Sequence, residues 1–154
     1  MDNIPIGLYF LLAFCEGLSV IFFMNCFLSL NMSKKEYIVL AIPYALLTFL
    51  LRKLPISFGT HSLIIICLLG GFISYYYKIK LSSALLGMII ATSIMLIIEL
   101  TSGYIIERIF LIQYNVFMNK PVWWFLSGLP HIIVTFMLAL FIKNLRSNKI
   151  NVTQ

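Results

Sequence analysis

The sequence predicts an all-α integral membrane protein, a bundle of about five transmembrane helices. Of its 154 residues, 62% are hydrophobic and only 10% are charged, against roughly 45–50% and 25% in soluble domains. Five apolar runs follow one another with short polar breaks, and the longer runs exceed the roughly 20 residues needed to cross a bilayer. The 11 Lys and Arg residues are scattered between these runs. They therefore act as topology signals, and nucleic acid is not expected as a partner.

The first predicted span covers residues 4–30 and contains one carboxylate, Glu16. No basic residue precedes it and no small-residue cleavage pattern follows it, so a retained helix is expected rather than a secretory signal. The second span, residues 37–51, is short and holds Pro43 near its middle. A proline there removes one backbone donor and predicts a kink. Pro55 then marks a loop before the third span.

The third span, residues 61–77, ends in three tyrosines that are typical of the membrane interface. A short turn leads from it into the fourth span, residues 81–106. Small residues recur at close spacing in both segments, which predicts that these two helices pack tightly against each other. The fifth span, residues 122–142, completes a membrane domain over residues 1–143. Residues 144–154 are expected to form a short basic tail in the cytoplasm.

Lysine and arginine fall unevenly on the two sides of such a five-span bundle. One side collects seven of them, including the pair Lys34 and Lys35 and those near the C-terminus, and the other side collects four. The positive-inside rule then places the C-terminus in the cytoplasm and the N-terminus outside. The expected location is the cell membrane, with the lipid bilayer as the surrounding partner.

Three ionisable side chains fall at about the same depth in the predicted spans. At 1.5 Å per residue, Glu16, Glu99 and His131 all lie near the centre or outer half of the membrane. An acid at that depth is costly unless it is paired, and such acids mark ligand or proton sites. One hydroxyl residue lies a helical turn from each of them: Ser19, Ser102 and Thr135. These six residues form a hypothetical ligand-binding cluster; the alternative is that they only fasten helices together.

The predicted outer loop, from Glu107 to Lys120, is too apolar for a solvated connection. Its aromatic residues include Phe110, Tyr114 and Phe117. Such a loop either lies flat in the interface as an amphipathic helix or lines a groove for an apolar ligand. An extracellular messenger would arrive at this loop.

Signals for catalysis are sparse. The cysteines Cys15, Cys26 and Cys67 all fall in predicted spans, where apolar burial keeps a thiol protonated and inert. His61 and Cys67 are the one thiol–imidazole pair, but residues six positions apart lie some 120° from each other around a helix. No phosphate-binding loop and no metal-ligand motif is present in the sequence. The sequence therefore predicts no enzyme, no cofactor and no metal site.

The segment from Arg52 to His61, RKLPISFGTH, leads into an apolar helix, a Lys-flanked hairpin and a helix with a late Glu99. Through these features nearly the whole chain resembles the N-terminal membrane domain of AgrC-like sensor histidine kinases, the GHKL class that detects peptide pheromones. The resemblance implies a sensor that binds an extracellular apolar or peptide signal and relays it to a cytoplasmic kinase or another membrane protein. A homodimer is one form that this could take.

Such kinases continue into a phosphoacceptor helix and an ATP-binding domain, which do not follow the last span here. The resemblance thus implies a sensor module without its output domain, either a fragment or a stand-alone relative. Two other classes stay open. One is a structural or accessory subunit of a transporter or biogenesis complex, in which Glu99 only fastens helices. The other is an AgrB-like membrane peptidase, although His61 and Cys67 do not match that family's spacing.

Overall fold

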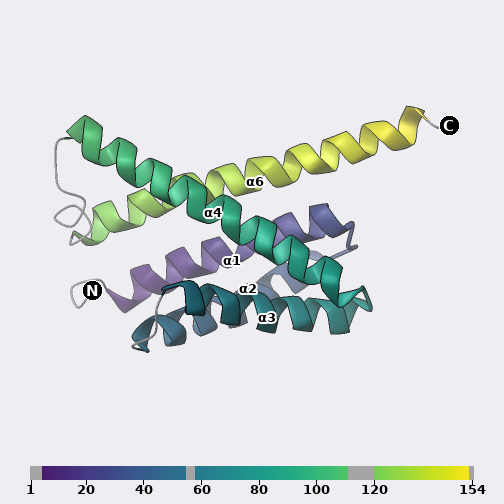
Figure 1. Ribbon diagram of the computed structural model, residues 1–154, viewed down its shortest axis with the longest axis horizontal. Coiled ribbons are helices and arrows are strands. Elements are labelled where there is room, and N and C mark those ends of the chain that lie inside the picture. The colour runs from purple at the N-terminus through teal and green to yellow at the C-terminus, as the bar shows by residue number, and fades with distance from the viewer. Residues whose placement is uncertain (1–4, 55–57, 111–119, 153–154) are drawn as a thin grey trace.

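The computed structural model describes residues 5–54, 58–110 and 120–152. All regular elements in this part of the chain are helices, which confirms the predicted all-α bundle. Figure 1 shows successive helices running in alternating directions. Their bounds are α1 (Ile6–Leu28), α2 (Lys34–Lys53), α3 (Phe58–Tyr77), α4 (Leu81–Phe110) and α6 (Pro121–Val152).

Four of the described helices, α1, α3, α4 and α6, are long and apolar enough to cross a membrane. The chain is therefore a multi-pass membrane protein. The remaining helix, α2, carries charges in its first and last turns, such as Lys34 and Lys53, which lower its mean hydropathy. It nevertheless packs along α1, and its outward side chains, including Val39 and Leu50, are apolar and exposed. This pattern suits contact with lipid tails.

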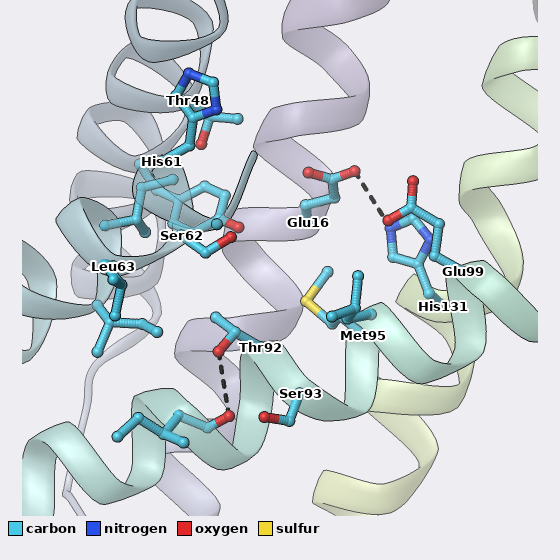
Figure 2. A pocket seen from close by; sticks show the side chains of 16 residues that line it. Glu16, Thr48, His61, Ser62, Leu63, Thr92, Ser93, Met95, Glu99 and His131 are labelled. Atoms are coloured by element: carbon cyan, nitrogen blue, oxygen red, sulfur yellow. Dashed lines mark hydrogen bonds and ion pairs between the residues drawn. The ribbon is translucent and has the colours of Figure 1, made fainter. Parts of the chain in front are cut away.

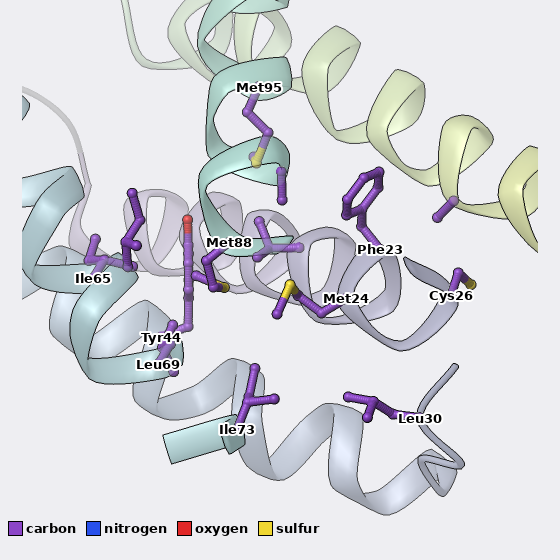
Figure 3. Close-up of a cluster of buried hydrophobic side chains, with 14 of the residues drawn as sticks. Phe23, Met24, Cys26, Leu30, Tyr44, Ile65, Leu69, Ile73, Met88 and Met95 are labelled. Carbon is purple, nitrogen blue, oxygen red and sulfur yellow. The ribbon is translucent and has the colours of Figure 1, made fainter. Parts of the chain in front are cut away.

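Helix α1 lies at the centre of the bundle. Half of its apolar stretch is buried, against 28% of the corresponding stretch in each of the other three spans. It packs against α2, α4 and α6. Figure 3 shows Phe23 and Met24 of α1 in one buried cluster with Tyr44 of α2, Ile73 of α3 and Met88 of α4. Every other helix thus adds side chains to the core around α1.

Small residues bring helices together, although not always the pair that the sequence suggested. A Cβ atom on Gly70 of α3 would lie 2.9 Å from Leu85 of α4, so the expected close α3–α4 packing exists there. Gly87, in the small-residue stripe of α4, instead faces Met24 of α1. Gly71 of α3 faces open space. Gly87 therefore lets α4 approach the central helix, whereas Gly70 lets α3 approach α4.

The turn after α1 is fixed by side chains at the end of the helix. Asn25 Nδ2 donates to the Tyr37 hydroxyl at 2.5 Å, and Ser29 closes α1 in the left-handed conformation, with φ of 55°. Arg146 of α6 donates to the Cys26 carbonyl at 3.2 Å and also to Ser29 Oγ. A cation is favourable beside the free carbonyls at a helix C-terminus. This contact holds α6 to the cytoplasm-facing end that the sequence predicted for α1.

Helices α4 and α6 both run past the predicted ends of their spans. Residues 107–110, expected to begin a loop, continue α4, and Arg108 Nε donates to the Tyr104 hydroxyl at 3.2 Å. The predicted tail, residues 144–154, is helical as far as Val152. No Gly or Pro follows the last span to end the helix there.

Helix α2 begins with a capping box. The Ser33 N–H donates to Glu36 Oε2, and the Glu36 N–H donates to Ser33 Oγ at 3.4 Å. The bond from the Ser33 N–H lowers the pKa of the exposed Glu36 carboxyl. Because this pKa is lower in the folded state than in the unfolded state, the carboxylate stabilises the fold above its ordinary pKa. That stabilisation is lost as the pH falls through the folded value.

We therefore expect Glu36→Gln to lessen the loss of thermal stability on acidification. The measurement is thermal denaturation in lipid nanodiscs over a pH series. Glu107→Gln is the matched control, because it removes a carboxylate that takes no part in the cap. Equal acid sensitivity in wild type and Glu36→Gln would contradict a role for the cap.

Candidate functional site

A cavity of about 390 Å³ lies between the helices, and all five contribute side chains to it (Figure 2). A volume in this range is typical of small-molecule sites, which are about 300–1,000 Å³. Four ionisable side chains line it: Glu16 from α1, His61 from α3, Glu99 from α4 and His131 from α6. Polar groups are therefore concentrated at one place inside an otherwise apolar bundle.

Glu16 and His131 form a buried pair across the α1–α6 interface. Glu16 Oε1 lies 3.2 Å from His131 Nε2, and the two residues are 7% and 3% exposed. When the carboxylate is ionised, the Nε2–H of His131 donates this bond. The other ring nitrogen, Nδ1, is buried and has no partner in the described part of the chain. The pair thus satisfies Glu16 but leaves one polar atom of His131 open to a ligand or a water molecule.

Glu99 lies on the same cavity but is only half-buried. Its carboxylate makes no hydrogen bond or ion pair with the residues that the structure describes. In Figure 2 it projects from α4 toward the side of the cavity that holds His131. An acid without a protein partner at this depth is energetically costly. Glu99 is consequently the group that most needs a partner from outside the protein.

A second side of the cavity carries His61 and Thr48, which Figure 2 shows away from Glu99 and His131. Both ring nitrogens of His61 and the Thr48 hydroxyl are buried without a partner among the described residues. At least 90% of buried polar groups in proteins have a hydrogen-bonding partner. These atoms therefore indicate a site that is filled by water or by a ligand.

The sequence did not indicate that His61 belongs to this site, because the residue was paired there only with Cys67. The structure separates these two residues. Cys67 is exposed, whereas His61 lines the cavity. Thr48 gave no signal either, because a lone threonine in an apolar helix is common. The register of α2 and α3 against α4 brings both residues to the cavity that Glu99 lines, on its other side.

The hydroxyl residues of the predicted cluster have other roles. Ser19 Oγ donates to the backbone carbonyl of Glu16 at 2.8 Å, and Ser102 Oγ donates to that of Glu99 at 3.0 Å. Thr135 is fully buried and its hydroxyl has no partner in the described residues, but it does not line the cavity. Without water, a serine in a helix satisfies its hydroxyl on its own preceding turn. Only the three ionisable residues of the predicted six meet at the cavity.

The predicted outer-loop site lies outside the described residues. Tyr114 and Phe117 fall in the segment 111–119, and Phe110 is described only as the last backbone position of α4. Among the described residues, no three His, Cys, Asp or Glu side chains are placed to share a metal ion.

Comparison of this chain with known proteins finds no matching family model, no matching curated protein and no matching solved structure. The likeness to AgrC-like membrane domains therefore rests on the sequence pattern alone. What the cavity can do must be argued from its own chemistry. Carboxylates and imidazoles in an apolar bundle can bind a hydrogen-bond donor or a cation, and they can hold protons.

Proposed function

We propose that this protein is a sensor or receptor module of the cell membrane. It binds an extracellular apolar or peptide signal in the cavity and relays that event to a cytoplasmic partner. The observation that carries this proposal is a cavity lined from all five helices, in which the Glu99 carboxylate, the His61 ring and the Thr48 hydroxyl have no partner among the described residues. A ligand that contacts every helix binds with an affinity that depends on how the helices are arranged. It can therefore shift their arrangement.

The direction of access follows from the distribution of positive charge. Seven of the 11 Lys and Arg residues fall on one side of a five-span topology, which favours an outside N-terminus and a cytoplasmic C-terminus. The cavity lining extends to Gly59 in the first turn of α3. In this topology that turn lies at the outer end of the bundle. A signal would thus enter from outside.

Helix α6 is the element best suited to pass the signal on. It is held to α1 at two levels, by His131 at the cavity and by Arg146 at the end of α1. Fifteen residues separate these levels, or about 22 Å along the helix. The helix then continues to Val152. A ligand that competes for Glu16 or His131 would move α6 relative to α1, and the helix would carry that movement to a kinase or another membrane protein.

Arg146→Gln is expected to loosen the end of α6 from α1, because a neutral amide bonds the Cys26 carbonyl more weakly than a guanidinium does. Spin labels at Lys35 and Asn144, in a background with the native cysteines replaced by alanine, report the separation of α2 and α6. The distance distribution should broaden in Arg146→Gln. It should be unchanged in Lys143→Gln, which removes a neighbouring charge. Identical distributions in all three proteins would contradict the contact as a restraint on α6.

The function itself is tested by gentle purification from native membranes, followed by mass spectrometry of the proteins and peptides that co-elute. Glu99→Gln is the test variant, and Glu107→Gln on the same helix is its control. A co-eluting kinase or secreted peptide that is lost in Glu99→Gln alone supports the sensor. A transporter or assembly complex that co-elutes equally from all three proteins would identify a structural subunit instead.

A further inference from the structure

We infer that the cavity selects ligands that carry an organic cation, an amine or guanidinium group, on a small apolar body. This inference rests on the proposed function, because it names the chemical class of the signal that would occupy the same site. It is argued from three properties of the cavity: its charge, its unpaired hydrogen-bonding atoms and its size.

The charge of the lining is acidic. Two carboxylates line the cavity, and none of the described side chains there is a lysine or an arginine. The imidazole of His131 can carry a positive charge, but it already lies 3.2 Å from Glu16. This leaves Glu99 without a countercharge. A cationic ligand would supply one and form a charge-assisted hydrogen bond with the half-buried carboxylate. An anionic ligand would meet repulsion from Glu99.

The unpaired atoms of the lining also favour a donor group. An ammonium group has three N–H donors and no acceptor. The cavity offers acceptors in the Glu99 carboxylate on one side and in the Thr48 hydroxyl on the other. Thr48 is 5% exposed and its hydroxyl has no partner among the described residues. Two sides of the cavity therefore present acceptors that the described part of the chain leaves unused.

The remaining lining limits the size and nature of the rest of the ligand. Leu63, Ile65 and Ile66 of α3 and Met95 and Leu96 of α4 give it an apolar wall. Its volume of about 390 Å³ lies toward the lower end of the range of about 300–1,000 Å³ found for small-molecule sites. This space suits the N-terminus or one basic side chain of a peptide with a neighbouring apolar residue. It does not suit a whole folded peptide.

The test uses the dipeptide amide Phe-Leu-NH₂ as the probe. It has a free ammonium group, an apolar body and no carboxylate. The N-acetylated dipeptide amide has almost the same shape but no charge. Binding of both radiolabelled probes to the protein in lipid nanodiscs is measured by equilibrium dialysis at pH 6.5, where an α-amino group with a pKa of about 7.7–8.0 is largely protonated. Empty nanodiscs give the background from lipid.

The free amine is expected to bind at least tenfold more tightly than its acetylated counterpart. Glu99→Gln should reduce that preference to near unity, whereas Glu107→Gln should retain it. The thermal stability of each variant, measured in parallel, shows whether it is folded. If Glu99→Gln proves unfolded, Glu99→Met takes its place, because it removes the charge without adding an unpaired polar group, and it should likewise reduce the preference to near unity.

Equal or weaker binding of the free amine would overturn the inference, as would a preference that survives Glu99→Gln in a folded protein. These results leave the sensor proposal standing, because a neutral signal could still co-elute from native membranes and depend on Glu99. Conversely, amine binding in a protein that co-elutes only with a transporter would support the ligand class while rejecting the sensor.

Discussion

Glu16→Ala is expected to lower the free energy of unfolding by about 1–3 kcal/mol, the cost of leaving a buried polar group without its partner. His131 is 3% exposed and would lose the carboxylate that its Nε2 contacts at 3.2 Å. Loss of the hydrogen bond alone would lower the free energy of unfolding by less, since hydrogen bonds between membrane helices average about 0.6 kcal/mol. Equilibrium unfolding in mixed micelles of increasing SDS content measures the change.

Two further variants separate the contribution of the Glu16–His131 pair to protein stability from its role in signal binding. Glu16→Gln keeps an oxygen that accepts from His131 and should retain most of the stability. Glu16→Leu combined with His131→Phe removes both polar groups and should recover most of what Glu16→Ala loses, because neither position then buries an unpaired group. The cavity would nevertheless have lost two of its polar side chains, and signal binding should fail. A Glu16→Ala protein as stable as wild type would show that the pair does not form.

Gly17→Ala is expected to cost about 1–3 kcal/mol through overpacking at the α1–α2 interface. An added Cβ atom would lie 2.8 Å from Cδ1 of the Tyr44 ring and 3.1 Å from its Cβ. The Cβ of Tyr44 cannot move without α2, and the residue is 6% exposed in the core. Since Tyr44 also lines the cavity, this substitution should weaken ligand binding as well as stability. Unfolding in mixed micelles and the dipeptide binding assay measure the two effects.

Gly71→Ala is the matched control for this prediction. A Cβ atom there meets no side chain within 4 Å, and alanine is favoured over glycine inside a helix by about 1 kcal/mol. We expect it to be neutral or stabilising. If Gly17→Ala and Gly71→Ala behave alike, the close approach of α1 to α2 is not as the structure describes it.

The sequence could predict depth in the membrane, but not the direction in which each helix faces. Depth follows from counting 1.5 Å per residue along spans of similar length. This count predicted that Glu16, Glu99 and His131 lie at a similar depth, and they line one cavity. The direction in which a side chain points around the helix axis cannot be obtained from such a count. Lipid tails are as apolar as a protein core, so a membrane helix is hydrophobic on its buried and exposed sides alike.

Three particular residues show the effect of this ambiguity. Gly87 belongs to the small-residue pattern from which packing of α4 on α3 was predicted, but it faces Met24 of α1. His61 was considered beside Cys67 but lines the cavity with the two carboxylates. Ser19 was expected to add a hydroxyl to the cluster but bonds to its own helix. For Gly87 and His61 the rotation of the helix about its axis decides the neighbour, and depth does not reveal that rotation. For Ser19 the hydroxyl instead bonds to the preceding turn of its own helix.

The separation of Glu16 and His131 in the chain has a consequence for biosynthesis. The two residues are 115 positions apart, so α1 leaves the ribosome long before its partner in α6 has been made. At about 5–20 residues per second, the interval is roughly 6–23 s. Throughout it, the newly inserted first helix must keep its carboxyl group in the membrane without the imidazole that later meets it. Translation that stops before α6 leaves that group without the imidazole that α6 supplies.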